Sequence, residues 1–495
     1  MQQPEFEPVA VAARTRAPSR SVNPDAALGW IRRLAPLLVR YRWRFAAYVF
    51  GALVAMLGRV VEPAIIRVAV DDGLVSQKSS LAPYVVVLVV LAVARGLITY
   101  FYRFGLFRLA FDLDTDLRIL LYQRFLTHDW PYYDRVSSGQ LVSRANSDIR
   151  SVQMFLTFSP LMLLTLVQFA VAVAYMASIS LRLTLVAVAA LPGVYLLGTR
   201  LRNQAFPLSW ISQGRVADVA TVVDENIAGV RVVRSFAAER RQLRQLARAA
   251  TALRWANVRA VDARARYNPV IENLPRLGMA GVLAYGGTLA IRGQVTTGTL
   301  FAFTAYVTQL QAPFRSLGMF LMLQQRAAAS AQRIYQVLDE QPTVQDRPGA
   351  IDLVDCRGDI CFDDVCFAYA DSPPLLNGFS LTIKAGETVA LVGRTGCGKS
   401  TVARLLGRFY DVDDGGSVSG SVSVDGHDVR NLTQVSLRHH LGFVFDEPFL
   451  FSLPLADNIA YARPDAELPA VAAAARDAQA EEFISNLPEI GRAHV

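Results

Sequence analysis

Long apolar stretches alternate with arginine-rich segments through the first two-thirds of the chain. A predominantly apolar stretch of about 20 residues is what an α-helix needs to cross a bilayer. Such stretches occur at 45–70, 81–104, 153–179, 183–200, 270–291 and 298–322. The pattern predicts six membrane-spanning helices, with both chain ends on the same side. Residues 1–44 precede them as a polar tail and an amphipathic helix lying on the membrane surface.

The segments between the predicted spans differ in length and charge. Three are short, and two, 105–152 and 201–269, are long and carry many arginines. Because positive charge gathers on the cytoplasmic side of membrane proteins, we expect the long segments and both chain ends to be cytoplasmic. Their apolar spacing indicates helices that continue beyond the lipid. Residues 45–325 are therefore interpreted as a six-helix membrane domain.

Beyond residue 325 the pattern changes. An Ala-rich helix gives way to a segment containing Pro and Gly, so 326–350 is interpreted as a linker. Residues 351–489 then hold short strand-like runs, DICFDDVCFAY, FSLTI and ETVALVG, separated by turn residues. No apolar run of spanning length recurs there. This part is predicted to be a soluble α/β domain.

Composition agrees with a membrane protein. Hydrophobic residues make up 53% of the chain and mean hydropathy is +0.29, too apolar for an ordinary soluble protein. The net charge of +8 would also suit a nucleic-acid partner, but the arginines flank apolar runs, so we expect no nucleic acid. The four cysteines lie in the last third without metal-ligand spacing and are interpreted as reduced thiols.

A phosphate-binding loop is predicted at residues 393–400. GRTGCGKS fits G-x-x-x-x-G-K-[ST] between the predicted strand ETVALVG and the helix-forming run TVARLLGRFY. The glycines let backbone N–H groups surround phosphates, Lys399 can reach the terminal phosphates, and Ser400 can ligate magnesium. A chance glycine turn is the alternative, but the chain has few lysines and one stands here. The predicted nucleotide-binding residues are Gly393, Arg394, Thr395, Gly396, Cys397, Gly398, Lys399, Ser400 and Thr401.

Over roughly residues 28–489 the chain resembles the exporter-type ABC transporters, in which each subunit carries six spans and one nucleotide-binding domain. Besides the P-loop, WPYYDRVSSGQLVSRANSDI and DENIAGVRVVRSFAAE carry the resemblance. Each alone could be a solvated helix. Together with the P-loop they imply coupling residues between the two domains, namely Tyr133, Asp134, Ser138, Gly139, Ser143, Arg144, Asp148, Glu225, Gly229, Val232, Val233, Phe236 and Glu239.

The resemblance also implies ATP and Mg²⁺ as cofactors. Tyr369 occupies the position of an aromatic ring that stacks on adenine in the family. Cys397 could make nucleotide binding sensitive to thiol reagents or be a small filler. Asp446 replaces a glutamine that touches magnesium. A carboxylate can ligate magnesium, so Ser400 and Asp446 are the predicted metal ligands, but it adds negative charge and donates no hydrogen bond when ionised.

The family pattern continues beyond Glu489 with a signature loop, a Walker B aspartate, a catalytic glutamate and a switch histidine. These are not found here, and residues 490–495 resemble translated adapter sequence. We therefore expect residues 351–489 to be a partial nucleotide-binding domain, 490–495 to be a non-native tail, and the chain as written to lack a catalytic residue for hydrolysis.

The function predicted is that of a subunit of an ATP-driven exporter in the plasma membrane. It would pair with a second half-transporter subunit, with a heterodimer slightly favoured by Asp446, and move an unidentified drug, lipid, peptide or similar substrate. One alternative is a degenerate ATP-binding partner subunit with a regulatory role. A P-loop kinase fused to a membrane anchor fits six spans poorly.

Charged residues inside the predicted spans are candidates for the transport path. Arg59 and Glu62 lie three residues apart in the first span and share a helix face, and Arg95 lies in the second. Charges at membrane depth face a polar cavity or pair with one another. The alternatives are a polar transport path lined by Arg59 and Glu62, or a purely structural pair.

Overall fold

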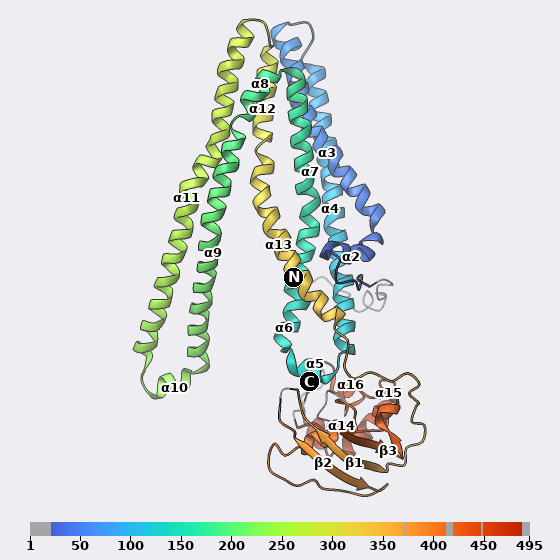
Figure 1. Cartoon of the computed structure of the whole chain (residues 1–495). Helices are drawn as coiled ribbons and strands as arrows, with labels where there is room; N and C mark the ends of the chain where they lie inside the picture. The colour runs from blue at the N-terminus through green and yellow to red at the C-terminus, as the bar shows by residue number, and fades with distance from the viewer. Residues whose placement is uncertain (1–20, 371, 412–418, 447–448, 488–495) are drawn as a thin grey trace. The chain divides into compact units, whose positions relative to one another are not determined.

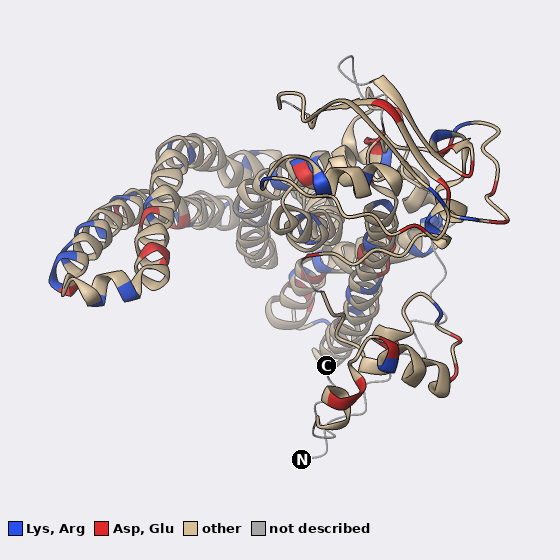
Figure 2. Cartoon of the chain, turned by 90° about the horizontal axis from the view of Figure 1, so that it is seen from below, with Lys and Arg blue, Asp and Glu red and all other residues tan. Residues whose placement is uncertain are grey.

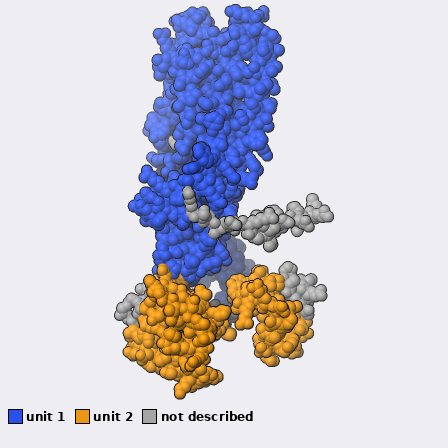
Figure 3. Space-filling view, turned by 90° about the vertical axis from the view of Figure 1, so that its right-hand side faces the viewer, with its two compact units in different colours: residues 1–128, 132–342 blue, residues 129–131, 343–495 orange. Residues whose placement is uncertain are grey.

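The computed structural model describes residues 21–370, 372–411, 419–446 and 449–487. The start of the predicted polar tail and the predicted tail 490–495 lie outside these residues. The chain divides into two compact units, coloured separately in Figure 3. Unit 1 comprises residues 1–128 and 132–342, and unit 2 comprises residues 129–131 and 343–495.

Unit 1 is helical (Figure 1). Its long helices are α2 (Trp30–Val39), α3 (Arg42–Val68), α4 (Ala82–Thr127), α7 (Ile149–Ile179), α8 (Leu181–Val188), α9 (Leu191–Ala228), α11 (Glu239–Ile291), α12 (Thr297–Gln309) and α13 (Ala312–Asp339). Shorter elements are η1 (Ala69–Val75), α5 (Trp130–Arg135), α6 (Ser138–Ser143), η2 (Arg144–Asp148) and α10 (Val230–Ser235). All six predicted spans fall within helices, two of them with a short interruption.

Four helical segments of the described residues are both long and apolar enough to cross a membrane: Arg42–Val75, Ala82–Thr127, Ser138–Ile179 and Leu181–Ala228. The other two predicted spans are helical but differ in character. The fifth lies at the end of α11 and contains Glu272 and Arg276. The sixth is divided between α12, of 13 residues, and the start of α13. Length and composition therefore identify the first four more clearly than the last two.

The contact between α3 and α12 depends on a proline. Pro63 lies inside α3 and has no N–H to donate to the carbonyl of Arg59, four residues earlier. Gln309 of α12 donates to that carbonyl instead, with Nε2 at 3.0 Å. Nearby, the buried hydroxyl of Tyr306 donates to the carbonyl of Val60 at 2.6 Å. Side chains of α12 thus complete the backbone hydrogen bonding of α3.

At the other end of α12, Asp71 of η1 caps the helix. Its Oδ1 accepts from the backbone N–H of Gly298 at 2.8 Å, and its Oδ2 accepts from the hydroxyl of Thr296 at 2.5 Å. A Cβ at Gly298 would lie 2.2 Å from the carbonyl oxygen of Arg67. Only glycine therefore allows the start of α12 to approach α3 this closely.

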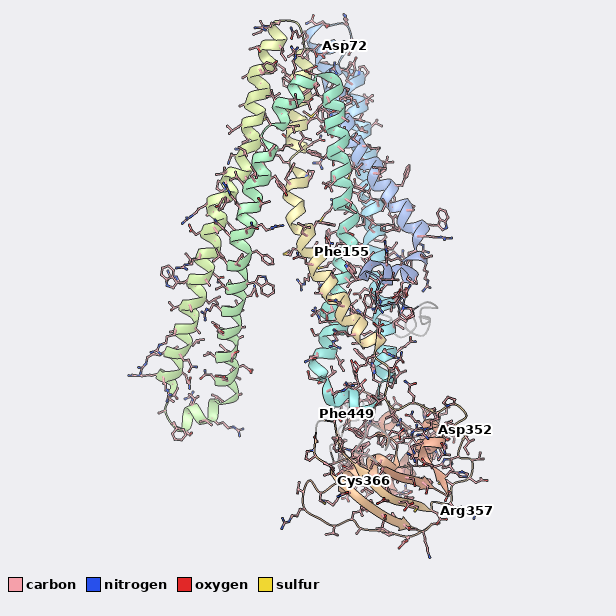
Figure 4. All side chains as sticks on the ribbon, viewed as in Figure 1. Asp72, Phe155, Asp352, Arg357, Cys366 and Phe449 are labelled. Carbon is pink, nitrogen blue, oxygen red and sulfur yellow. The ribbon has the colours of Figure 1, made fainter. Side chains whose placement is uncertain are left out.

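The amphipathic segment predicted before the first span forms α2, which is tied to the end of α13. The buried Arg33 donates to both carboxylate oxygens of Asp339 at 2.9 and 2.6 Å and lies over the ring of Tyr335, 4.1 Å from its centroid. Phe155 of α7, labelled in Figure 4, packs edge-on against Trp30 at 5.2 Å. This helix has an intramolecular partner that its hydrophobic pattern alone did not predict.

Unit 2 contains a four-stranded antiparallel sheet with strand order β2-β1-β3-β4. Its strands are β1 (Ile360–Phe367), β2 (Leu376–Ile383), β3 (Ser419–Val424) and β4 (His427–Asp428). Its helical elements are α14 (Lys399–Leu406), η3 (Val429–Asn431), α15 (Gln434–His439), α16 (Leu455–Ile459), α17 (Leu468–Asp477) and α18 (Glu481–Ser485). Phe362, Val365 and Leu405 belong to the core between sheet and helices.

The strand predicted at ETVALVG is wrong for the described structure, because residues 387–393 are not part of a strand. Val392 is 93% exposed, and Val444, in a second apolar run, GFVF at residues 442–445, is fully exposed. A strand exists only where a neighbour accepts and donates its ladder hydrogen bonds. The described residues supply no such neighbour to either run.

Candidate functional site: the P-loop and the coupling segments

The P-loop begins after residue 392 and leads into α14. Gly396 and Gly398 adopt left-handed backbone conformations, with φ of 85° and 100°, which L side chains rarely adopt. A Cβ at Gly398 would lie 2.9 Å from Cδ2 of Leu376, and one at Gly393 would lie 2.6 Å from Sγ of Cys397. The glycines are therefore required by both backbone conformation and space.

Lys399 places its ammonium inside this loop. Nζ donates to the carbonyls of Gly393 and Arg394, each at 2.9 Å, and lies 3.8 Å from Sγ of Cys397. Within the described residues, no acceptor is found for the backbone N–H groups of Gly398, Lys399 and Ser400. Free N–H groups at a helix N-terminus next to a cation form an anion-binding site. The residues present therefore fit the phosphates of a nucleotide.

Tyr369 lies against the helix that follows the loop. Its hydroxyl is 2.9 Å from Oγ1 of the buried Thr401 and accepts a hydrogen bond from Arg404 at 3.2 Å. Its ring packs edge-on against Phe367 and Tyr410, with centroids 5.0 and 5.1 Å apart. The ring remains partly exposed. Its stacking on adenine stays a prediction, and these contacts hold it beside the P-loop.

The predicted metal ligands are not brought into contact by the structure. Ser400 and Asp446 are both exposed, and the described residues offer the Asp446 side chain no hydrogen bond or ion pair. Among the described residues, no group of three or more His, Cys, Asp or Glu side chains could hold a metal ion. Ser400 could still contribute one oxygen to Mg²⁺, with nucleotide and water oxygens completing the coordination, as is usual for this ion.

The first predicted coupling segment forms α5, α6 and η2. The Tyr133 hydroxyl donates to the Phe125 carbonyl, and Asp134 is exposed. Ser138 and Gly139 begin α6, and Arg144 begins η2. Asp148 is buried, and its two oxygens accept from Nε and Nη2 of Arg333 at 2.9 and 2.5 Å. This hydrogen-bonded carboxylate raises the pKa of Arg333. Asp148 thus joins the coupling segment to α13.

Three residues of this segment, Asp129–Pro131, belong to unit 2. Oδ2 of Asp129 accepts from the backbone N–H groups of Thr343 and Val344 at 2.5 and 2.9 Å. The Trp130 ring stacks on Phe409 with centroids 4.4 Å apart, and the guanidinium of Arg404 lies 5.5 Å from its centroid. Sequence reasoning missed Trp130, although an aromatic residue before a proline at the turn of a long segment could have indicated it.

The second predicted coupling segment is the tip of the α9–α11 hairpin. Glu225 lies in the last turn of α9, and its carbonyl accepts from the N–H of Gly229 at 2.9 Å. Gly229 ends α9, and α10 closes the tip. Val232 and Phe236 are 61% and 80% exposed. Arginines are distributed along this hairpin, drawn blue in Figure 2. Within unit 1 these residues form an exposed apolar and basic tip.

The charged residues predicted for the transport path do not pair with each other. Glu62 accepts a hydrogen bond from Arg95 of α4 at 2.5 Å. Arg59 instead lines a cavity of about 360 Å³ between α3, α4 and α7, together with Arg95 and Arg103. Glu62 therefore belongs to an interhelical ion pair and Arg59 to a cavity wall.

Four helices of the described residues that are long and apolar enough to cross a membrane and a P-loop domain indicate a membrane protein that binds a nucleotide. The chain matches the families described as "ABC transporter transmembrane region" over residues 45–314 and "ABC transporter" over residues 376–494. It belongs to the ABC transporter family, with the helical arrangement of its exporter-type members.

Similar proteins include a multidrug efflux ATP-binding/permease protein of Mycobacterium bovis, 38% identical over 90% of this chain and 38% of that protein. An ATP-dependent lipid A-core flippase of Syntrophus aciditrophicus is 30% identical over 92% of this chain and 76% of the flippase. A solved bacterial Atm1-family ABC exporter with ATP bound has a TM-score of 0.71 and 25% identity, covering 92% of this chain and 80% of the exporter. The chain thus spans 38% of the length of the first of these relatives.

Proposed function

We propose that the chain is a subunit of an ATP-driven exporter in the plasma membrane, with the N-terminus and P-loop domain in the cytoplasm. The observation that carries the proposal is Lys399 held within a loop of free N–H groups, in a chain whose other unit has four bilayer-length helices. The multidrug and lipid names of the relatives above support a drug or lipid substrate.

Each part of the site has a task in this proposal. Lys399 moves its two hydrogen bonds from loop carbonyls to phosphate oxygens, and the N–H groups at the start of α14 bind the same anion. Tyr369 supports the base through ring stacking, which contributes about 1–3 kcal/mol. ATP supplies the free energy of closure between nucleotide-binding domains, and Mg²⁺ offsets phosphate charge. Asp129 and Trp130 transmit the resulting displacement to α4 and α6, between which they lie in the chain.

A second subunit is part of the proposal because of the α9–α11 hairpin. Trp210, Ile227, Phe236 and Trp255 are each more than 60% exposed, and all lie within 201–269, the segment predicted to extend beyond the lipid. Large apolar side chains grouped on such a surface indicate a protein partner. The partner we propose is another half-transporter subunit, and the carboxylate of Asp446 favours a different one over a second copy.

Asp446 also supports a second candidate, a regulatory ATP-binding subunit with little turnover. Negative charge beside the phosphates opposes the charge that hydrolysis develops. The two candidates differ in Asp446→Gln. This substitution should raise ATP turnover of the assembled transporter if Asp446 limits hydrolysis, and leave it unchanged if the site already turns over ATP.

The test of nucleotide binding uses Lys399→Ala in the purified protein. We expect labelling by a photoreactive ATP analogue to fall by about tenfold or more, because the loop loses its cation. Lys384→Ala is the matched control, since Lys384 is an exposed lysine of the same unit. Equal labelling of both variants and the parent protein would contradict the proposed site. ATP-dependent substrate uptake into inverted vesicles then tests export itself.

A further inference from the structure

The cavity between α3, α4 and α7 is lined by continuous helix faces. α4 contributes Arg95, Thr99 and Arg103, which are four residues apart and form one stripe. α3 contributes Met56 and Arg59. α7 contributes residues at helical spacing, Phe158, Leu161, Met162, Thr165 and Gln168. The cavity therefore combines three arginines and three uncharged polar side chains of Thr and Gln with an apolar wall.

Its charge is only partly neutralised. Arg95 donates to Glu62. Within the described residues, Arg59 and Arg103 have no carboxylate or other side-chain hydrogen-bond partner, and no carboxylate is among the residues that line the cavity. Three guanidinium groups and one carboxylate leave two positive charges in excess. Arg59 lies 14 residues into the predicted span 45–70, about 21 Å along the helix, which is deep relative to a hydrocarbon layer of about 30 Å.

Unneutralised charge at that depth is unfavourable unless water or an anion accompanies it. Guanidinium groups bind phosphate, carboxylate and sulfate through paired N–H donors. The apolar wall of Phe158, Leu161 and Met162 lies next to these donors and suits an acyl or alkyl chain. A polar head and an apolar tail would each contact a matching surface.

We infer that this cavity binds the anionic oxyanion group of an amphiphilic substrate, with Arg59 and Arg103 as its principal ligands. The inference rests on the proposed export function and specifies its substrate class. Gln168 of the cavity wall donates to Oε1 of Gln309 at 3.3 Å, and Gln309 donates to the carbonyl of Arg59. Occupation of the cavity is thus connected to α12 by two hydrogen bonds.

The experiment measures binding of radiolabelled tetradecyl phosphate to the purified protein in a nonionic detergent. This binding measurement needs no ATP turnover, so absence of tetradecyl phosphate binding would leave the export proposal intact. Loss of photoreactive ATP labelling would concern the nucleotide site alone. We expect saturable binding that weakens about tenfold or more in the double variant Arg59→Gln/Arg103→Gln. Arg108→Gln is the matched control, an exposed arginine of the same helix outside the cavity, and should bind as the parent protein does.

The single variant Arg103→Gln changes an exposed side chain and keeps the test valid if the double variant does not fold. Competition by inorganic phosphate distinguishes the two possible sources of the oxyanion. If excess phosphate displaces the probe, the cavity binds a free soluble anion. If the probe stays bound at large excess of phosphate, the cavity binds a lipid headgroup. Undiminished binding in Arg103→Gln and in a folded double variant would overturn the inference. Binding of tetradecanol as tight as that of tetradecyl phosphate would overturn it as well.

Discussion

Replacing Trp130 by alanine should separate nucleotide binding from transport. The change removes a stacked ring pair with Phe409 at 4.4 Å, a tilted contact with Phe445 at 5.8 Å and the guanidinium of Arg404 at 5.5 Å. An aromatic pair contributes about 0.5–1.5 kcal/mol beyond burial, and a partly exposed cation–π contact contributes about 0.5–1 kcal/mol. A fully buried tryptophan costs about 3–5 kcal/mol on truncation. Since Trp130 is only partly buried, we expect a loss of about 2–3 kcal/mol.

A loss of that size increases local opening of residues 129–131 by about 30- to 150-fold. Hydrogen exchange of the amides around Trp130 measures the opening. ATP-dependent transport should fall, while photoreactive ATP labelling of the P-loop stays unchanged, because Trp130 makes no contact with Lys399. Trp43→Ala is the control, since this tryptophan of α3 is 76% exposed and belongs to neither predicted coupling segment. Unchanged exchange at 129–131 together with full transport would refute the reasoning.

Three further predictions concern single contacts. Arg333→Met leaves the buried carboxylate of Asp148 without its cation. Because Arg333 is partly exposed, we expect the free energy of unfolding of unit 1 to fall by only about 2 kcal/mol. Thermal unfolding should show this loss, and adding Asp148→Asn to the variant should restore part of it. Asp71→Ala should cost about 1 kcal/mol as a lost helix cap, visible as faster exchange at Gly298, whereas Asp71→Asn should cost less. Burial would raise the pKa of Asp425, but hydrogen bonds from the N–H groups of Asp359, Arg357 and Gly358 outweigh it and hold this pKa below its usual value. The stabilisation is therefore present above the unfolded pKa of about 3.9 and is lost as pH falls through the folded value; urea unfolding of unit 2 should show a smaller acid loss in Asp425→Asn, and an identical pH profile would contradict this.

The parts of the fold that follow from local pattern could be predicted from sequence. Hydrophobic length located helices at the six predicted spans, four of them in described segments long and apolar enough to cross a membrane. The glycine spacing at 393–398 located a loop whose left-handed conformations the structure contains. Helix α13 ends at Asp339, shortly before the Pro- and Gly-containing segment. In each case the residues that determine the structure are neighbours in the chain.

The parts that depend on distant residues could not be predicted. A structural pair of Arg59 and Glu62 was one of two alternatives from the sequence, but the partner of Glu62 is Arg95, 33 residues away. The run ETVALVG has strand-like composition, yet composition supplies no neighbouring strand. Trp130 is the first residue of the segment WPYYDRVSSGQLVSRANSDI, but its place in unit 2 depends on contacts with Phe409 and Arg404, more than 270 residues later. Periodicity identifies a face of an element and not the partner of that face.

The proline at position 63 has a consequence for hydration. In an uninterrupted helix each carbonyl is shielded by its own turn, so water competes poorly for it. The carbonyl of Arg59 depends on a side-chain amide from another helix, and a water molecule can replace that amide at little free-energy cost. If solvent enters beside Arg59, water can therefore take over the hydrogen bond of this carbonyl when Gln309 withdraws, so separation of α3 and α12 at this position leaves the carbonyl bonded.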